Sequence, residues 1–325
     1  MIARELVALP SYTDEVVCGL TSRQKTLPFK LLYDDRGSEL FEEITRLPEY
    51  YLTRIELEIL QGRSGEMVQE IGTPVSVVEL GAGTATKTGT LLRAFSRRQM
   101  RLKYFPVDIS PSALDDAKRR IRNECPNAAI RPVIADFSNG FHFLREISER
   151  KLVLYLGSSI GNFEWENAVG MLSKVREQLS PGDALLLGTD MAKDPSILLP
   201  AYDDAQGVTS EFSKNILLRL NRELGANFDV ETFQHIAEWN PAQSRIEIYL
   251  ESLQGQTVTL GVPRLGIQFR SGERIHTENS YKFTMEMVGR MLRVSGFVLS
   301  RSWFDRREWF GLHLAQAHSA TKGTK

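Results

Sequence analysis

A glycine turn between apolar and charged residues is the first feature of this chain that could bind a ligand. Residues 75–87 read VSVVELGAGTATK, so an apolar run ends at Gly81 and Gly83 and leads to Lys87. A short continuous apolar run is typical of a buried parallel strand, and glycines after it let the backbone turn tightly and approach a ligand. The pattern predicts the first strand of an α/β sheet beside a nucleotide-type ligand, although such a turn would also serve tight packing alone.

Four further apolar runs end in polar or glycine residues. They are residues 104–108, ending at Asp108; 130–137, ending at Asp136 and Phe137; 152–156, leading to Gly157 and then Asn162; and 184–190, ending at Asp190. Ligands of open α/β sheets bind outside the carboxyl ends of the strands, so we expect these residues to converge on one crevice. Asp108 follows the glycine turn at the distance where nucleotide folds place the acid that binds ribose hydroxyls.

The elements that must position these residues alternate along the chain. Helices predicted at residues 87–98, 112–122 and 165–178 separate the strands, which favours a parallel sheet. We therefore expect an α/β domain over residues 64–191 and 284–325. Residues 1–63 and 192–283 do not share this alternation, and we expect them to form a second domain that supplies substrate contacts.

Composition excludes several classes of protein. Forty basic and forty-one acidic residues give a net charge of −1, so the chain is not expected to bind nucleic acid or an anionic membrane. Two cysteines and five histidines show no disulfide framework or metal-ligand spacing, which favours a reducing cytoplasm and predicts no metal site. We find no apolar stretch long enough to span a membrane and no coiled-coil pattern, and we expect a cytoplasmic monomer.

The turn also resembles a particular class of cofactor site. Position 86 is Thr where dinucleotide-binding turns have a third glycine, and ELGAGT is similar to the pattern of S-adenosylmethionine-dependent methyltransferases. The whole chain resembles the histidine-specific Nα-methyltransferases of ergothioneine biosynthesis, which trimethylate histidine to hercynine. The resemblance rests on LLYDDRGSELFEEITRLPEYYLTR, VELGAGTATKT, LGSSIGNF, LLLGTDMAKD, AYDDAQGVTSEFSKNIL and TENSYKF. It implies a Rossmann-like class I methyltransferase sheet together with a substrate-binding domain.

The resemblance also implies roles for individual residues. Those implied for the S-adenosylmethionine site are Gly81, Lys87, Asp108, Asp136 and Phe137, to which we add Gly83 and Gly157 because they follow strands. Those implied for histidine are Tyr50, Asn162 and Tyr202 at its α-amino and carboxylate groups, Tyr33 near the amine, and Glu278 and Ser280 at the imidazole. Glu278 and Ser280 have the spacing that puts both side chains on one face of an extended segment. We expect Tyr33, or water held by it and Asn162, to accept the amine proton.

The same residues also allow other interpretations. The tyrosines could be half-buried packing residues. Ile248 stands where other members of the family carry Met, near the substrate side chain, so tryptophan or another aromatic amino acid is an alternative substrate. A protein that binds S-adenosylmethionine without catalysis is a further alternative.

Overall fold

The computed structural model describes residues 10–136 and 140–317, which form two compact units. Unit 1 comprises the described parts of Met1–Tyr51 and Asp194–Ser280, and unit 2 those of Leu52–Lys193 and Tyr281–Lys325. The first division therefore lies at Tyr51, twelve residues before the predicted boundary at residue 63. The reason is that the helix α3 (Leu52–Ile71) packs against α4, β7, β13 and β14 of unit 2.

Eight strands form the sheet of unit 2 within the described residues. Their bounds are β2 (Ser76–Leu80), β3 (Leu102–Asp108), β4 (Ala128–Ile130), β5 (Val133–Ile134), β6 (Lys151–Tyr155), β7 (Ala184–Asp190), β13 (Phe297–Phe304) and β14 (Phe310–Ala317). The order is β13-β14-β7-β6-β2-β3-β4, with β5 also paired to β3. β2 pairs in parallel with β3 and with β6, β6 with β7, and β3 with β4 and with β5. β14 is antiparallel to both of its neighbours, β7 and β13.

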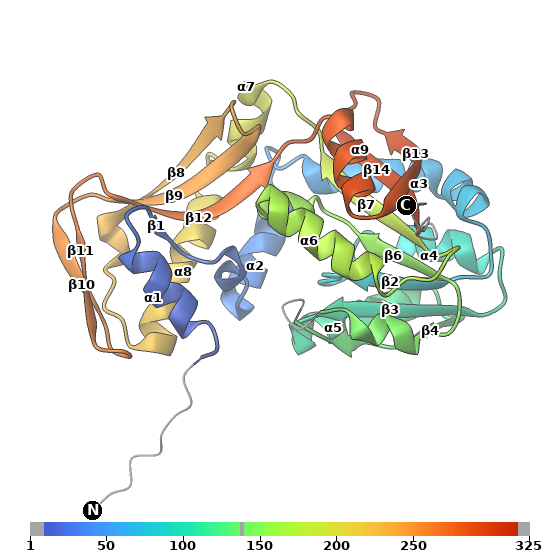
Figure 1. Ribbon diagram of the computed structural model, residues 1–325, viewed down its shortest axis with the longest axis horizontal. Coiled ribbons are helices and arrows are strands. Elements are labelled where there is room, and N and C mark those ends of the chain that lie inside the picture. Colours follow the sequence, from blue (N-terminus) through green and yellow to red (C-terminus); the bar gives the residue numbers. More distant parts are fainter. Residues whose placement is uncertain (1–9, 137–139, 318–325) are drawn as a thin grey trace, which may run out of the picture. The chain divides into compact units, whose positions relative to one another are not determined.

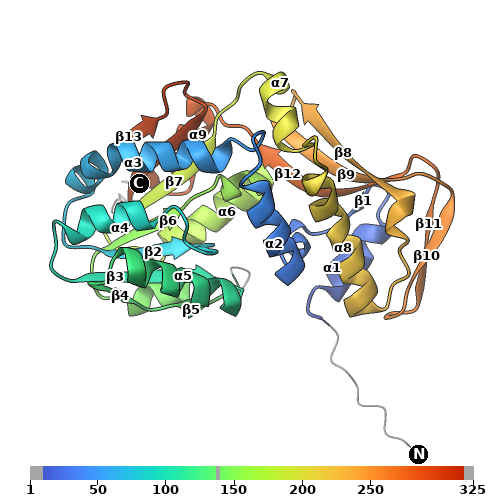
Figure 2. The ribbon, with the colours of Figure 1, turned by 180° about the vertical axis from the view of Figure 1, so that it is seen from behind.

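Helices cover both faces of this sheet. Figure 1 shows α6 and α9 in front of it, and Figure 2, from behind, shows α3, α4 and α5 on the opposite face. The bounds are α4 (Gly89–Ser96), α5 (Pro111–Glu124), α6 (Trp165–Arg176) and α9 (Met285–Val294). Ser110 caps α5 by accepting a hydrogen bond from the Ala113 amide at 3.3 Å, ahead of a proline in the first turn. Unit 2 thus forms the α/β domain that the alternation predicted, with helices on both faces of its sheet.

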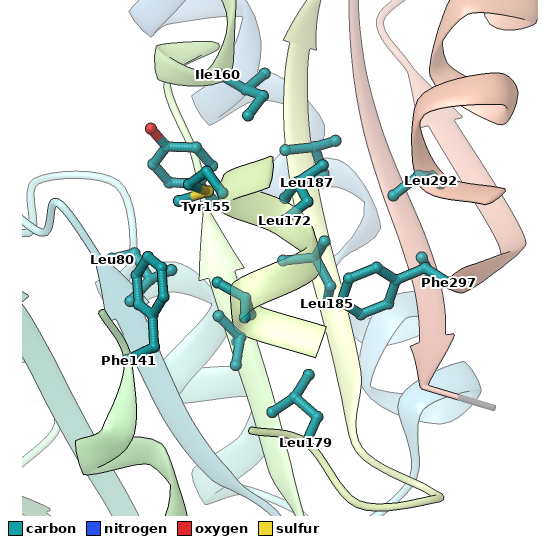
Figure 3. Close-up of a cluster of buried hydrophobic side chains, with 14 of the residues drawn as sticks. Leu80, Phe141, Tyr155, Ile160, Leu172, Leu179, Leu185, Leu187, Leu292 and Phe297 are labelled. Carbon is teal, nitrogen blue, oxygen red and sulfur yellow. The ribbon is translucent and has the colours of Figure 1, made fainter. Parts of the chain in front are cut away.

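One cluster of buried apolar side chains in unit 2 lies between the sheet and the α6/α9 layer. All residues of β2, β6 and β7 are buried, as expected for parallel strands whose sequences are mostly apolar. Figure 3 shows Leu185 and Leu187 of β7 beside Leu172 of α6, with Phe297 next to Leu185. Packing of this kind fixes the strands, and therefore the positions of their carboxyl ends.

The third predicted strand differs from the prediction. Residues 130–137 do not form one strand: β4 ends at Ile130 and β5 begins at Val133. Pro132 between them has no amide N–H to donate to a sheet, so the ladder is interrupted there. Asp136 lies after β5, and Phe137 lies outside the described residues.

Unit 1 combines a small sheet with three helices. The strands are β1 (Lys25–Thr26), β12 (Arg274–Tyr281), β9 (Arg245–Ser252) and β8 (Phe233–Asn240), in that order, and β10 (Gln256–Leu260) pairs with β11 (Leu265–Phe269) as a separate hairpin. The helices are α1 (Thr13–Thr21), α2 (Asp35–Ile44) and α8 (Val208–Leu224), and α7 (Pro195–Leu198) is a single turn. Asp34 caps α2 through the Gly37 amide at 2.7 Å and accepts from Asn215 of α8 at 2.7 Å, which joins the two helices.

No helix in the described ranges is long and apolar enough to cross a membrane. Within residues 10–136 and 140–317 no three His, Cys, Asp or Glu side chains are grouped so that they could hold a metal ion.

Candidate active site

The predicted glycine turn forms the carboxyl end of β2. Gly81 and Gly83 have φ values of 66° and 49°, in the left-handed region that favours glycine, and a Cβ at either position would meet no atom within 4 Å. The backbone therefore turns beside open space. The Gly83 amide donates to Asp108 Oδ2 at 2.9 Å, and the Ser110 amide donates to Oδ1 at 3.0 Å. The predicted meeting of the glycine turn with Asp108 is thus confirmed.

The carboxyl end of β6 is a second constrained turn. Gly157 and Ser158 are both left-handed, with φ values of 74° and 58°. For a residue with a side chain this conformation costs about 1–3 kcal/mol and persists only where the surroundings enforce it. Here the Ser158 hydroxyl accepts a hydrogen bond from the Asp190 amide at 2.8 Å, which ties the end of β6 to the end of β7. A Cβ on Gly157 would lie 3.3 Å from Lys87 Nζ, so the predicted cofactor lysine comes close to this turn.

Glu56 of α3 is a member of this group that the sequence reasoning missed. Its buried carboxylate forms an ion pair with Lys87 and accepts a hydrogen bond from the Gly157 amide at 2.8 Å. A signal was present, because Glu56 occupies the same helical stripe as the buried Leu52 and Leu60, four positions away on either side. A charged residue on an apolar stripe is the feature that could have revealed it.

Glu79, the acid just before the glycine turn, is buried and has a perturbed pKa. Burial raises its pKa to about 7, and hydrogen bonds from Thr88 and Tyr104 only partly offset that rise. The carboxyl group links β2, the start of α4 and β3.

Two remaining residues follow the strands β5 and β6. Asp136 is half-buried after β5, and Asn162 is half-buried at the end of a short 3-10 helix (Ser159–Asn162) that follows β6. Unit 2 thus carries Gly81, Gly83, Lys87, Asp108, Asp136, Gly157 and Asn162 at or after the carboxyl ends of parallel strands.

The other predicted residues all belong to unit 1, where several of the aromatic ones cluster. The half-buried Tyr33 makes edge contacts with Phe41 and Phe212, with ring centroids 5.6 and 5.5 Å apart. Phe41 makes an edge contact with the buried Tyr50, and Tyr50 with Tyr202, at 6.1 and 6.4 Å. Such edge-to-face geometry holds the rings in defined orientations. Packing alone was the alternative reading of these tyrosines, and they do pack against one another.

The strand β12 carries the predicted imidazole-binding pair. Glu278 and Ser280 are buried, and as positions i and i+2 of one strand they share a face. The Ser280 hydroxyl is hydrogen-bonded to the Tyr202 hydroxyl at 2.8 Å. Ile248 of β9, the strand beside β12, is also buried, and its carbonyl accepts from the Thr277 hydroxyl at 3.2 Å.

His235 was not singled out by the sequence, yet it fixes Tyr202. Its Nε2 donates to the Tyr202 carbonyl oxygen at 2.8 Å. Burial lowers the pKa of His235, so the neutral ring makes this bond.

Comparison with known proteins gives these residues a context. A family model described as "Histidine-specific methyltransferase, SAM-dependent" matches residues 12–317. The chain belongs to this family. The histidine N-alpha-methyltransferases of Mycolicibacterium smegmatis and Mycobacterium tuberculosis are 42% and 43% identical to it, each over 93% of both chains. Ergothioneine biosynthesis protein 1 of Neurospora crassa is 31% identical over 89% of this chain and 33% of that protein.

The strand ends of unit 2 offer groups that suit the methyl donor of an S-adenosylmethionine-dependent methyltransferase. That molecule carries a carboxylate, two ribose hydroxyls and an adenine amino group. Lys87 supplies a cation, Asp108 and Asp136 supply carboxylate acceptors, and the left-handed glycines leave open space beside the backbone. These residues fit the cofactor by charge and hydrogen-bonding type.

Proposed function

We propose that this protein transfers methyl groups from S-adenosylmethionine to the α-amine of L-histidine, three times in succession, to give hercynine for ergothioneine biosynthesis. The names of its relatives support histidine as the substrate and the α-nitrogen as the position of methylation. The structural observation that carries the proposal is the buried Glu278 on the same strand face as Ser280, whose hydroxyl is bonded to Tyr202. An imidazole needs two such polar partners.

For cofactor binding we assign one role to each polar side chain. Lys87 binds the carboxylate, Asp108 the ribose hydroxyls and Asp136 the adenine amino group; Phe137, outside the described residues, stays a prediction for the ring face. When bound, S-adenosylmethionine supplies a methyl group on a positively charged sulfur. The protein mainly positions the amine, because an in-line displacement depends on a short and aligned approach.

Selection of histidine is assigned to β12. The Glu278 carboxylate accepts from one imidazole N–H, and Ser280 binds the other nitrogen. A side chain without an N–H at this position would not make the hydrogen bond to the buried Glu278 carboxylate, and the loss of such a bond costs more than a missing methylene. Tyr50, Tyr202 and Asn162 are assigned to the α-amino and carboxylate groups, and Ile248 to the wall beside the side chain.

The amine must lose a proton before each transfer. The α-amine of a free amino acid is largely protonated at neutral pH. We assign the proton to Tyr33 or to water bound to it, since the Phe41 and Phe212 rings hold Tyr33 in place. Tyr33→Phe should then slow methylation at pH 7 and recover at higher pH. Normal monomethylation by this variant at pH 7 would contradict the assignment.

The reaction is tested by offering L-histidine, histamine and Nα-acetylhistidine with S-adenosylmethionine, followed by mass spectrometry with fragmentation. The proposal expects methyl groups on the α-nitrogen of histidine, no product from the blocked amine, and poor turnover of histamine, which lacks the carboxylate. Methyl groups on the imidazole would contradict it.

We also propose that the protein is a cytoplasmic monomer. Gel filtration coupled to light scattering tests the oligomeric state.

A further inference from the structure

Glu56 is a fully buried carboxylate in the middle of an apolar helix face. Its side chain is 0% exposed, and α3 buries Leu52, Ile55, Ile59 and Leu60 around it. A charged group without water is stable only when ions and hydrogen-bond donors replace its hydration. The groups that surround Glu56 therefore indicate what it does.

Both carboxylate oxygens are directed at the candidate cofactor site. Oε1 accepts from the Gly157 amide at 2.8 Å, and Oε2 pairs with Lys87 Nζ. Gly157 follows β6 and Lys87 follows β2, and these two strands are parallel neighbours. The chain runs from β2 outward through β3 on one side and from β6 through β7 on the other, so this is the switch point of the sheet where ligands bind.

Two glycines make room for this arrangement. A Cβ on Gly188, within β7, would lie 2.5 Å from Glu56 Oε1, closer than atoms can approach. A Cβ on Gly157 would lie 3.3 Å from Lys87 Nζ. Three adjacent strands thus accommodate the carboxylate and its lysine.

The lysine of the pair is more accessible than the glutamate. The Lys87 side chain is 19% exposed, against 0% for Glu56. An ammonium has three donors, so Lys87 can bind Glu56 and still offer donors to a second anion.

We propose that Glu56 is a positioning residue for S-adenosylmethionine, holding the Lys87 ammonium and the Gly157 turn so that Lys87 binds the carboxylate of the cofactor. This inference rests on the cofactor role proposed for Lys87. Glu56 acts only on the amino-acid end of the cofactor. Ligands that lack that end do not depend on it.

Calorimetric titration with two ligands tests the role without catalysis. S-adenosylhomocysteine carries the carboxylate, whereas 5′-methylthioadenosine has the same adenosine part without the amino-acid end. Glu56→Gln should weaken S-adenosylhomocysteine binding at least tenfold and change 5′-methylthioadenosine binding less than twofold. Lys87→Met should give the same pattern, and the double variant should resemble Lys87→Met, because the two residues act as one unit. Glu58→Gln, an exposed glutamate two positions along α3, is the matched control and should bind both ligands normally.

Several results would overturn the inference. Equal losses for both ligands in Glu56→Gln would show a general structural role. Unchanged S-adenosylhomocysteine binding in either Glu56→Gln or Lys87→Met would show that the pair does not act on the carboxylate. If Glu56→Gln does not fold, Glu56→Asp keeps the charge and shifts it by one methylene, and a selective loss of at least threefold is expected. Failure of histidine methylation would leave these binding results intact, so the two proposals fail separately.

Discussion

The ionisation of Glu79 should make the stability of unit 2 depend on pH in an unusual direction. This carboxyl group is 4% exposed and accepts hydrogen bonds from Thr88 and Tyr104. Burial raises its pKa from 4.5 to about 7. Between these two values the folded chain holds a proton that the unfolded chain releases, so stability falls as pH rises from 4.5 to 7 and changes no further above that.

The size of the effect follows from the shift. One pKa unit corresponds to about 1.4 kcal/mol, so a rise from 4.5 to about 7 gives about 3 kcal/mol. Other carboxyl groups act in the opposite direction, because the pKa values of Asp34 and Glu247 are lowered: burial raises each, but hydrogen bonds to each more than offset it. Only a comparison with a variant isolates Glu79.

Glu79→Gln is that variant, since the amide keeps the shape and an acceptor but does not titrate. We expect the free energy of unfolding of Glu79→Gln, minus that of the wild type, to rise by about 3 kcal/mol between pH 4.5 and 7.5. Urea unfolding followed by tryptophan fluorescence measures it, because Trp165, Trp303 and Trp309 lie in unit 2 and only Trp239 lies in unit 1. Glu58→Gln controls for the substitution itself. A difference that stays flat over this range would refute the reasoning.

Three further predictions concern other parts of the molecule. Glu278→Ala should weaken histidine binding at least tenfold, because it removes a charge-assisted hydrogen bond worth about 1.5–3 kcal/mol. The binding of S-adenosylhomocysteine should stay within twofold of the wild type. Equal losses for both ligands in calorimetry would exclude a role of Glu278 in selecting the substrate. Gly188→Ala should lower the free energy of unfolding in urea by about 1–3 kcal/mol, because its Cβ would lie 2.5 Å from a Glu56 oxygen and 3.3 Å from the Phe310 ring. Gly289→Ala on α9, where a Cβ would meet no atom within 4 Å, should change it little. Equal effects of the two substitutions would contradict the crowding at Gly188. Asp204→Ala should cost about 1–2 kcal/mol at pH 7, because Asp204 accepts from the Val208 and Thr209 amides at 3.1 and 2.7 Å at the start of α8. Burial raises the pKa of Asp204, but these bonds more than offset it and hold it below 3.8, so the cost should shrink as pH falls through that lowered pKa; a cost independent of pH down to acid unfolding would argue against the cap.

The sheet of unit 2 could be predicted because buried parallel strands have a local signature. Each of β2, β6 and β7 is mostly apolar and ends at, or is followed by, a glycine or a polar residue. Since parallel strands end at the same edge, the meeting of Gly83 with Asp108 follows from sequence position alone. The break at Pro132 was also a local signal and was missed, because the apolar residues Ile130 and Val133 lie close to it on either side.

Contacts between distant segments could not be predicted in the same way. Glu56 lies 101 positions before Gly157, and nothing in the sequence around either residue specifies the other. The assignment of α3 to unit 2 has the same cause, since its apolar stripe shows that the helix is buried but not against which strands. The hydrogen bond between Tyr202 and Ser280, 78 positions apart, was likewise not predicted, because the family resemblance implied only that each residue binds a part of the substrate.

Histidine is the amino acid that we propose this methyltransferase modifies. The most direct test incubates the protein with S-adenosylmethionine and an equimolar mixture of the twenty amino acids, and follows the products by mass spectrometry. We expect histidine alone to gain mass, ending at a product heavier by about 42 mass units, since each methyl replaces a hydrogen of the amine or its proton. Methylation of tryptophan or another amino acid in place of histidine would contradict the roles given to Glu278 and Ser280.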